Sequence, residues 1–418
     1  MLKACFFGSS IGAMLQPTNG VGMQMTPTGP LCGVRIIDLT SIYSGPICVS
    51  ILGDQGADVI KVEAPGGDPM RQGTPRRNGV TASFAMMNRN KRSMVIDLQK
   101  PAGRALLLDL VRTADAVVEN YRPGVMARLG LAYDTLVTIN PRIVVASING
   151  VGPDGPYANR RVYDAVIQAV TGFADLQSVD TGEPTMINTL IADKVTAMTA
   201  AQAVTAALFA AGRTGVGQQV AISMIDASLF FLWPDSMSRH GLVGEGVDLA
   251  PYASHASMLR RTRDGHVAVM PVKVGEWEGA FRALGLPNLF KEERFSTGAV
   301  RLNNAALFQQ VLSEAYATFT TDEICARLEV EDVPWARINT RDQVVDDPQI
   351  QSMGALVEYD HPRAGRVRQP RPPGQFQLTP ATLHRPSPDL GEHTDEVLRE
   401  LGLDESRVVA LKAAGVVA

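Results

Sequence analysis

The first half of the chain alternates between short, continuous apolar runs and segments with helical apolar spacing. Five of the apolar runs are typical of buried strands: residues 34–40, 57–63, 92–98, 114–120 and 142–149. Three segments between them have the spacing of helices: residues 45–56, 100–114 and 133–141. Strands that alternate with helices predict an α/β fold with a doubly wound, Rossmann-like parallel sheet.

The segment IADKVTAMTAAQAVTAALFAAG, residues 191–212, predicts a helix that is packed on most of its surface. Most of its residues are small and apolar, yet Asp193 stands near its start. An acid in this position has two interpretations. Asp193 either caps the helix by accepting from backbone N–H groups, or it is a chemical reagent.

The pattern changes after a strand at 219–223 and an apolar helix that follows it. Residues 248–345 predict a smaller α+β domain, in which Asp264-Gly265 signals a hairpin. Residues 369–390 contain six prolines, too many for a helix or a central strand, so we expect an extended strap there. A last helix is predicted to begin after Thr394 as its N-cap.

These patterns divide the chain into a large domain, a small domain and the segments that join them. In order, we expect a disordered leader at 1–29, the N-terminal part of the large α/β domain at 30–225, a linker at 226–247, the small α+β domain at 248–345, and a C-terminal segment at 346–418 that returns to the large domain.

Composition and charge narrow the classes of partner. The 418 residues carry 39 basic and 43 acidic side chains, a net charge of −4, which argues against nucleic acid and anionic membranes as partners. Four cysteines without a C-x-x-C pair suit a reducing compartment, so we expect a cytoplasmic protein. Six scattered histidines predict no metal site, and the apolar stretch near 200–212 looks too short to span a bilayer.

Two familiar motifs are discounted by their context. The G-x-S-x-G pattern at residues 8–12 lies in the doubtful leader, and the first histidine of the chain is His240. The G-x-G-x-x-G pattern at residues 150–155 follows a strand, but Pro153 and Pro156 prevent the helix start that a pyrophosphate needs. We interpret this second pattern as a tight Gly-Pro loop.

A cluster of basic residues occupies the segments that join the early strands. It consists of Arg71, Arg76, Arg77, Arg89, Lys91 and Arg92. Charge-rich loops are often simply solvated. In a protein of net negative charge, the local excess is alternatively a site for a polyphosphate ligand.

The order of several motifs resembles the class III coenzyme A transferase family, which also contains α-methylacyl-CoA racemases. These motifs are VRIIDLTSIYSGP, LGDQGADVIKVEAPGGD, NRNKRSMVIDL, ADAVVENYRPGVMARLGL, NPRIVVASINGVGPDGP and AALFAAGRTGVGQQV. The resemblance runs from about Leu31 to Met224 and resumes in DGHVAV, DDPQI and LGEHTDEVL. It implies an enzyme that acts on CoA thioesters, has no tightly bound cofactor, and forms an interlocked homodimer.

The resemblance implies that Asp193 is the nucleophile. A carboxylate that attacks an acyl-CoA carbonyl gives an aspartyl anhydride, and the CoA thiolate then returns to form an aspartyl-CoA thioester. An acceptor carboxylic acid finally takes the CoA. Small side chains along the helix leave room for the pantetheine arm, and its first N–H groups can hold developing negative charge.

Other positions are carried across as contacts to CoA. They are Tyr43, Ser44, Arg71, Ile96, Gln99, Asn120, Tyr121, Arg128, Arg161, Tyr163 and Met224. At Gln99 the family has a lysine, so that phosphate contact departs from the pattern. Tyr121 and Met224 have an alternative as ordinary core residues, and Arg128 as the partner of a helix C-terminus.

Transferase, racemase and sensor remain as alternatives. Racemases of the family use a histidine in a G-H-D triplet, and the matching triplet here is Val162-Tyr163-Asp164. Tyrosine has a reference pKa of ~10 and is a poor exchange base near neutral pH, which favours CoA transfer. A non-catalytic acyl-CoA binding protein is the third class. Oxalate-using members carry a run of glycines that 241–252 lacks, which favours a larger acyl pair than formyl-CoA and oxalate.

Overall fold

The computed structural model describes residues 27–178, 182–247 and 258–418, so residues 1–26 of the expected leader lie outside it. The chain forms two compact units. Among the described residues, the first comprises 27–178, 183–247 and 352–418, and the second comprises 182 and 258–351.

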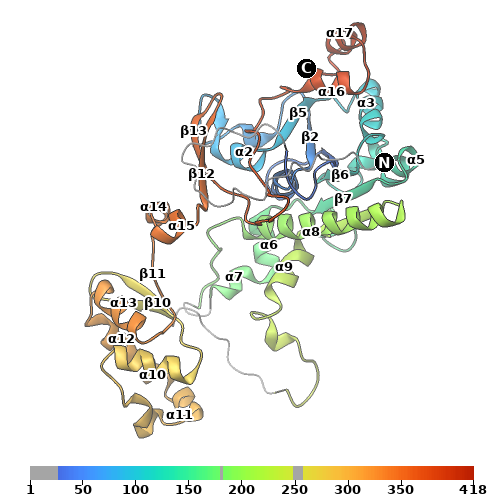
Figure 1. The fold of residues 1–418 in the computed structure, drawn as a ribbon. Helices are drawn as coiled ribbons and strands as arrows, with labels where there is room; N and C mark the ends of the chain where they lie inside the picture. Colours follow the sequence, from blue (N-terminus) through green and yellow to red (C-terminus); the bar gives the residue numbers. More distant parts are fainter. Residues whose placement is uncertain (1–26, 179–181, 248–257) are drawn as a thin grey trace. The chain divides into compact units, whose positions relative to one another are not determined.

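A six-stranded sheet forms the centre of the first unit (Figure 1). Its strands are β1 (Arg35–Asp38), β2 (Asp58–Glu63), β5 (Lys91–Val95), β6 (Ala116–Glu119), β7 (Val144–Asn149) and β8 (Gln219–Ser223). Their order is β5-β2-β1-β6-β7-β8, and every neighbouring pair is parallel. The predicted parallel α/β sheet is therefore confirmed.

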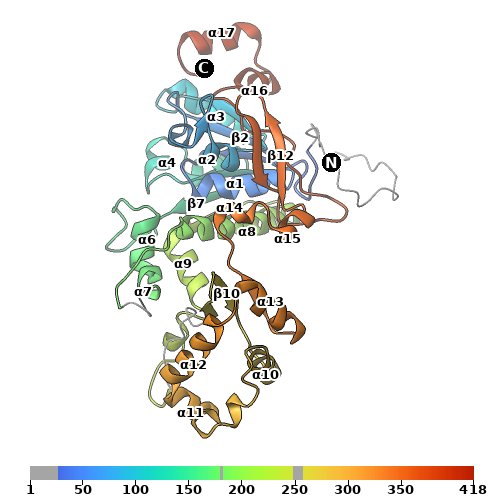
Figure 2. The ribbon, with the colours of Figure 1, turned by 90° about the vertical axis from the view of Figure 1, so that its left-hand side faces the viewer.

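Helices cover both faces of this sheet (Figure 2). On one face, α1 (Ser44–Asp54) and α8 (Ile191–Thr214) pack on alternate strand residues such as Ile36 and Val118. On the other face, α3 (Pro101–Val111) and α5 (Tyr133–Ile139) pack on residues such as Ile37 and Val117. Adjacent strand residues thus enter opposite cores, because successive side chains of a strand point to opposite faces.

Helix α8 lies close to its neighbours because its buried face is built from small residues. That face includes Ala197, Ala200, Ala201, Val204, Ala207 and Ala211. The helix has 24 residues and, by length and composition only, is long and apolar enough to cross a membrane. The apolar stretch is therefore longer than the one that we expected near residues 200–212. In the structure these alanines belong to the core between the sheet and α1.

The C-terminal segment returns to the first unit. Strands β12 (Leu356–His361) and β13 (Gly365–Pro370) form an antiparallel hairpin, and the residues after β13 run without a helix or strand to α16 (Thr394–Glu400), as expected for the strap. The predicted N-cap was wrong: His393 occupies that position, and the Thr394 hydroxyl accepts from the Val95 N–H. A further helix, α17 (Glu405–Ala413), was not predicted.

Shorter elements complete the first unit. They are β3 (Arg76–Arg77), β4 (Val80–Thr81), α2 (Ala82–Met87), α4 (Val125–Arg128), α6 (Asp164–Thr171), α7 (Phe173–Leu176) and α9 (Met224–Leu232). Residues 226–247, which we expected to be a linker, begin inside α9.

The second unit combines a small antiparallel sheet with helices. Its sheet is β11-β10-β9, from β9 (Leu259–Arg261), β10 (His266–Val269) and β11 (Trp335–Arg337). Its helices are α10 (Val274–Ala283), α11 (Gly298–Asn303), α12 (Ala305–Ala317), α13 (Thr321–Val330), α14 (Arg341–Val344) and α15 (Pro348–Ser352). Strands β9 and β10 pair on either side of Asp264-Gly265, which confirms the predicted hairpin.

Four members of the predicted basic cluster form ion pairs with the protein itself. The pairs are Arg71 with Glu63, Arg89 with Asp54, Lys91 with Asp38, and Arg92 with Asp58, Glu396 and Glu400. The Lys91 and Asp38 side chains are fully buried. For Arg89, Lys91 and Arg92, both the solvated-loop and the polyphosphate interpretations are corrected, because these buried charges are neutralised internally. Arg71 keeps its predicted contact to CoA. Arg76 and Arg77 are exposed.

Candidate active site

A cavity of about 320 Å³ opens beside β1, where the order of the strands in the sheet reverses. The chain runs from β1 to β2 on one side, whereas β6 lies on the other side of β1. The cavity is lined by residues that follow the carboxyl ends of β1, β6 and β7: Ser41–Ser44, Asn120–Pro123 and Asn149–Gly152. Such a switch point is the usual ligand site of a doubly wound sheet.

Asp193 lines this cavity from the first turn of α8. The helix begins after Leu190, whose side chain makes no capping hydrogen bond. The Asp193 N–H donates to Asp164 Oδ2 at 3.0 Å, so the acid that serves the start of α8 comes from α6. The interpretation of Asp193 as the helix cap is therefore corrected, and its own carboxylate is left for another purpose.

The environment of Asp193 raises its pKa to about 6. Burial is the largest cause, and the negative charge of Asp164 adds to it. The hydroxyl and the backbone N–H of Ser44 act in the opposite direction, because their hydrogen bonds favour the ionised carboxylate. Asp193 is thus ionised at neutral pH while only weakly solvated, which suits a nucleophile.

Asp164 is fixed by a buried network. Gln168 Nε2 donates to Asp164 Oδ1 at 2.5 Å and to the Thr189 carbonyl at 3.1 Å. Gln168 Oε1 accepts from the Ile187 N–H at 2.9 Å. The amide side chain therefore ties α6 to the segment that enters α8, and this arrangement holds Asp193 in place.

The N-terminus of α1 provides the donors that face Asp193. Ser44 is its first residue, and its N–H has no intrahelical acceptor, as is usual in a first helical turn. Gly45 allows a close approach to the preceding loop, because a Cβ there would lie 2.3 Å from Thr40 Cβ. A helix N-terminus stabilises negative charge, so this end can serve a carboxylate or an oxyanion.

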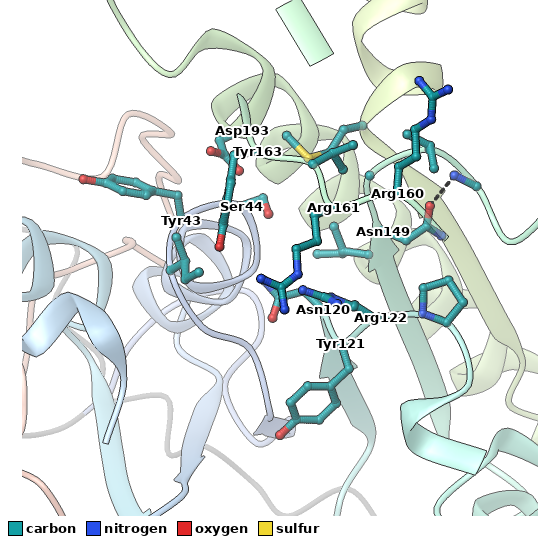
Figure 3. A pocket seen from close by; sticks show the side chains of 18 of the residues that line it. Tyr43, Ser44, Asn120, Tyr121, Arg122, Asn149, Arg160, Arg161, Tyr163 and Asp193 are labelled. Carbon is teal, nitrogen blue, oxygen red and sulfur yellow. Dashed lines mark hydrogen bonds between the residues drawn. The ribbon is translucent and has the colours of Figure 1, made fainter. Parts of the chain in front are cut away.

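The structure brings together eight of the predicted site residues. Asp193, Tyr43, Ser44, Asn120, Tyr121, Arg161, Tyr163 and Met224 all line the cavity (Figure 3). The Arg161 guanidinium points toward Asn120 in this view. Burial raises the Tyr121 pKa to about 12, and the ring also packs against the sheet core. Met224 is buried beside Ile167. Tyr121 and Met224 therefore also belong partly to the core, as the alternative interpretation expected.

Four predicted CoA contacts do not line this cavity. Ile96 is 1% exposed in the core and bridges to Val417. Gln99 is exposed after β5, and Arg128 is exposed at the end of α4. Arg71 donates to Glu63 and to the Pro388 carbonyl. Their assignment to CoA stays a prediction.

Sequence reasoning missed two further arginines of the cavity, Arg122 and Arg160. Among the described residues, neither of them nor Arg161 has an ion-pair partner, while Arg160 stacks on the Tyr157 ring at 3.9 Å. Arg122 directly follows Tyr121 in the motif ENYRPG, and Arg160 precedes Arg161, so adjacency was the available signal. Together the three guanidinium groups make the cavity suitable for a polyanion.

The Gly-Pro loop also belongs to this site. No helix starts between Gly150 and Gly155, which confirms its interpretation as a loop. Asn149 Oδ1 accepts from the Gly152 N–H at 2.5 Å and closes the turn (Figure 3). A Cβ at Gly150 would lie 2.0 Å from Val162 Cγ2, so glycine permits the close approach of the two cavity walls.

Comparisons with known proteins agree along nearly the whole chain. A profile described as CoA-transferase family III matches residues 31–394. The human protein named succinyl-CoA:glutarate CoA-transferase is 31% identical over 99% of this chain and 96% of its own. The formyl-CoA:oxalate CoA-transferase of Afipia carboxidovorans is 32% identical over 92% and 97%. A crystal structure of a CAIB/BAIF family protein from Brucella suis has a TM-score of 0.78 and 32% identity, and covers 90% of this chain and 100% of that one.

Proposed function

The chain belongs to CoA-transferase family III, and from this premise we propose that it moves CoA from an acyl-CoA thioester to a carboxylic acid with Asp193 as the nucleophile. One observation carries the proposal. The Asp193 carboxylate lies in the cavity at the sheet's switch point, beside the N-terminus of α1 and on a helix whose own cap is Asp164.

The first half of the reaction transfers CoA to the enzyme. An oxygen of Asp193 attacks the thioester carbonyl and the C–S bond breaks. The CoA thiolate is released, and an acyl-aspartyl anhydride is formed. The thiolate then attacks the aspartyl carbonyl of that anhydride. The donor acid departs as a carboxylate, and Asp193 is left as an aspartyl-CoA thioester.

The second half repeats these steps with the acceptor. The acceptor carboxylate attacks the aspartyl-CoA carbonyl and expels the thiolate, which gives a second anhydride. The thiolate attacks the acceptor's acyl carbon, so the new thioester forms and Asp193 is released as a carboxylate. No proton is transferred at any step, which explains how the site operates although no histidine is among the described residues that line the cavity.

The residues around Asp193 fit the charges of this reaction. Each attack puts negative charge on a carbonyl oxygen, and the N–H of Ser44, at the start of α1, is a preorganised donor for that oxygen. The partial burial of Asp193 leaves its carboxylate less solvated and more reactive. Arg122, Arg160 and Arg161 supply positive charge for the phosphates of CoA.

The substrate pair is a separate part of the proposal. Relatives are named for succinyl-CoA with glutarate and for formyl-CoA with oxalate, so the names of relatives do not select one pair. The segment 241–252 lacks the run of glycines of oxalate-using members. We therefore propose a larger acyl donor and acceptor than formyl-CoA and oxalate.

Two measurements distinguish a CoA-transferase from a racemase and from a non-catalytic acyl-CoA binding protein. The protein is incubated with a panel of acyl-CoA donors, treated with hydroxylamine, and weighed by intact-mass spectrometry. A CoA-transferase forms an acyl or CoA adduct that hydroxylamine converts to a hydroxamate at Asp193. A racemase instead exchanges the α-proton of a 2-methylacyl-CoA with deuterium from solvent, and a binding protein does neither. Absence of any adduct during turnover would overturn the proposed nucleophile.

Location and assembly are proposed on the same basis. The cysteine pattern supports a cytoplasmic protein, and the family resemblance supports an interlocked homodimer. Small-molecule acyl-CoA and carboxylic acid are the proposed partners, without a tightly bound cofactor, a metal, nucleic acid or a membrane. Light scattering of the purified protein tests the dimer.

A further inference from the structure

Ile42, between β1 and the N-terminus of α1, has an unfavourable backbone conformation. Its φ is +74°, in the left-handed region that a β-branched residue rarely occupies. Ile42 also lines the cavity, two residues before Ser44. Such a conformation persists only where the surrounding contacts enforce it, and it is often associated with functional sites.

A fully buried ion pair lies against this loop. Lys61 Nζ donates to Asp68 Oδ2 and to the Thr40 carbonyl, each at 2.9 Å. Asp68 Oδ1 accepts from the Ile42 N–H at 3.4 Å. The side chains of Lys61 and Asp68 are 0% and 1% exposed. This pair therefore fixes the backbone on both sides of Ser41.

A second buried pair holds both ends of the loop. Asp38 Oδ1 accepts from the N–H and the hydroxyl of Thr40, at 2.9 and 2.5 Å. Lys91 Nζ donates to Asp38 Oδ2 at 2.9 Å and to the Pro46 carbonyl, inside α1, at 3.0 Å. The loop is thus joined at its start and just beyond its end to the same pair of charges.

Asn120, directly after β6, fixes the middle of the loop. Its Oδ1 accepts from the Ser41 N–H at 2.9 Å, and its Nδ2 donates to the Ser41 carbonyl at 2.8 Å. Consecutive residues Thr40, Ser41 and Ile42 therefore each have a backbone group bound by a side chain from another strand or loop.

Buried ion pairs are a poor means of increasing stability alone. Two charges lose their hydration, and apolar residues of similar volume often stabilise a protein as well or better. What the charged groups supply here is a set of strong, directed hydrogen bonds to a strained backbone. Their contacts concentrate on the loop whose end carries the Ser44 N–H.

We infer that the two buried pairs, Lys61–Asp68 and Asp38–Lys91, are positioning residues that hold the loop at Ile42 in its strained form, so that the N–H of Ser44 is aimed at Asp193. This inference rests on the proposed function. The four charged residues act through the loop and do not touch the substrate.

Two substitutions of Ile42 separate conformation from side-chain size. Ile42→Ala removes most of the side chain but keeps an L-residue, whereas Ile42→Gly also relieves the strain of a φ of +74°. Because the buried pairs are needed to hold a strained backbone, we expect Lys61→Met to lower kcat about tenfold or more, Ile42→Gly to restore most of that loss in the double variant, and Ile42→Ala to restore little of it. We also expect the acid limb of kcat to lie at higher pH in Lys61→Met, because a misplaced Ser44 stabilises the Asp193 carboxylate less. The rates are compared at a temperature at which circular dichroism shows every variant to be folded.

Lys61→Met tests the buried pair directly, and Arg92→Met is its matched control. Arg92 is also a nearly buried cation, but its partners lie away from the loop. They are Asp58, at the start of β2, and Glu396 and Glu400 in α16. Hydrogen exchange of a peptide covering residues 40–46, read by mass spectrometry without substrate, should accelerate in Lys61→Met but not in Arg92→Met.

The two arms distinguish failure of this inference from failure of the proposed function. If the wild-type protein transfers CoA and Ile42→Gly restores no more of the Lys61→Met loss than Ile42→Ala does, the inference is overturned. If the wild-type protein transfers no CoA, the proposed function fails and the exchange measurement decides alone. Faster exchange in Lys61→Met but not in Arg92→Met then supports a network that holds the loop, and equal exchange in the two variants overturns it.

Discussion

The N–H of Asp193 donates a 3.0 Å hydrogen bond to the carboxylate of Asp164, which lies on a different helix. One acid thus serves the N-terminus of α8, and the other is left at the cavity beside α1. This division has a chemical consequence. The charge of Asp164 helps to raise the pKa of Asp193, while the hydroxyl and the N–H of Ser44, at the N-terminus of α1, limit that rise.

Asp193→Asn should abolish CoA transfer without weakening the fold. The amide has nearly the same shape but is not a nucleophile, so we expect kcat to fall by at least about 10³-fold. The folded protein should be as stable as the wild type or more stable above pH 6, because a partly buried charge is removed. Initial rates and urea unfolding measure the two effects, and calorimetry should show that CoA still binds. Near-normal transfer by this variant would contradict the mechanism.

The rate of transfer should rise with pH through about 6, because the attacking carboxylate must be ionised. Ser44→Ala removes hydroxyl donation to the carboxylate and should move this acid limb to higher pH. Asp164→Asn removes a negative charge and should move it to lower pH, each by roughly one pH unit. Profiles of kcat/KM for the three proteins test the signs. Shifts in the same direction would exclude this account of the Asp193 environment.

Gly45→Ala should reduce both activity and stability. The added Cβ would lie 2.3 Å from Thr40 Cβ, so α1 or the loop must move, and the Ser44 N–H moves with it. We expect a cost of about 1–3 kcal/mol in unfolding free energy, together with a lower kcat. Gly212→Ala is the control, because it lies in α8 with open space around the new Cβ and should stabilise by about 0.5–1 kcal/mol. Equal effects at the two sites would argue against steric contact at Gly45.

Arg161→Gln should raise the KM for the CoA thioester about tenfold, a loss of about 1.4 kcal/mol, with a smaller change in kcat. Arg161 lines the cavity, and removal of its charge weakens phosphate binding. The KM of the variant should also depend less on salt concentration. Arg112→Gln is the matched control, because Arg112 is exposed at the end of α3 and pairs with Asp109. An unchanged KM in Arg161→Gln would remove this residue from the CoA site.

The strap should make the protein less stable in mild acid. Burial lowers the pKa of His384 from 6.5 to about 4, and His361 and His393 in the same region also have lowered pKa values because they are buried. The unfolded state binds these protons more tightly, so stability present above pH 6.5 is lost as the pH falls toward 4. For His384 the loss is at most about 3 kcal/mol.

Urea unfolding between pH 4 and 7 measures this loss. His384→Gln should flatten the dependence on pH, because the substituted side chain does not titrate. A variant with the same slope as the wild type would show that His384 is not responsible.

The sheet and α8 were predictable because their signals are local. Apolar runs predicted β1, β2 and β6 to within two residues at each end, and the motif around Asp193 predicted a site residue that lines the cavity. Those signals depend on periodicity and on order along the chain, which the sequence shows directly.

Except for Arg71 with Glu63, which are eight positions apart, the ion pairs of the basic cluster were not predictable because their partners are far apart in sequence. Arg92 binds Glu400 across 308 positions, and Arg89 reaches the Pro370 carbonyl across 281. A cluster of basic residues therefore looked like a ligand site until the fold supplied the acids. Asp164 was missed as the cap of α8 for the same reason, because only the packing of α6 against α8 brings it to Asp193.

The C-terminal helices close a core that begins near residue 37. Val397, Leu398, Val408 and Leu411 pack with Ile37 and Leu107 in one cluster, and Val417 bridges to Ile96. A nascent chain therefore cannot complete this core until residues 397–417 have left the ribosome. Until then, apolar residues on one face of the central sheet stay partly exposed to solvent. During that interval the first unit is most prone to aggregate and depends most on a chaperone.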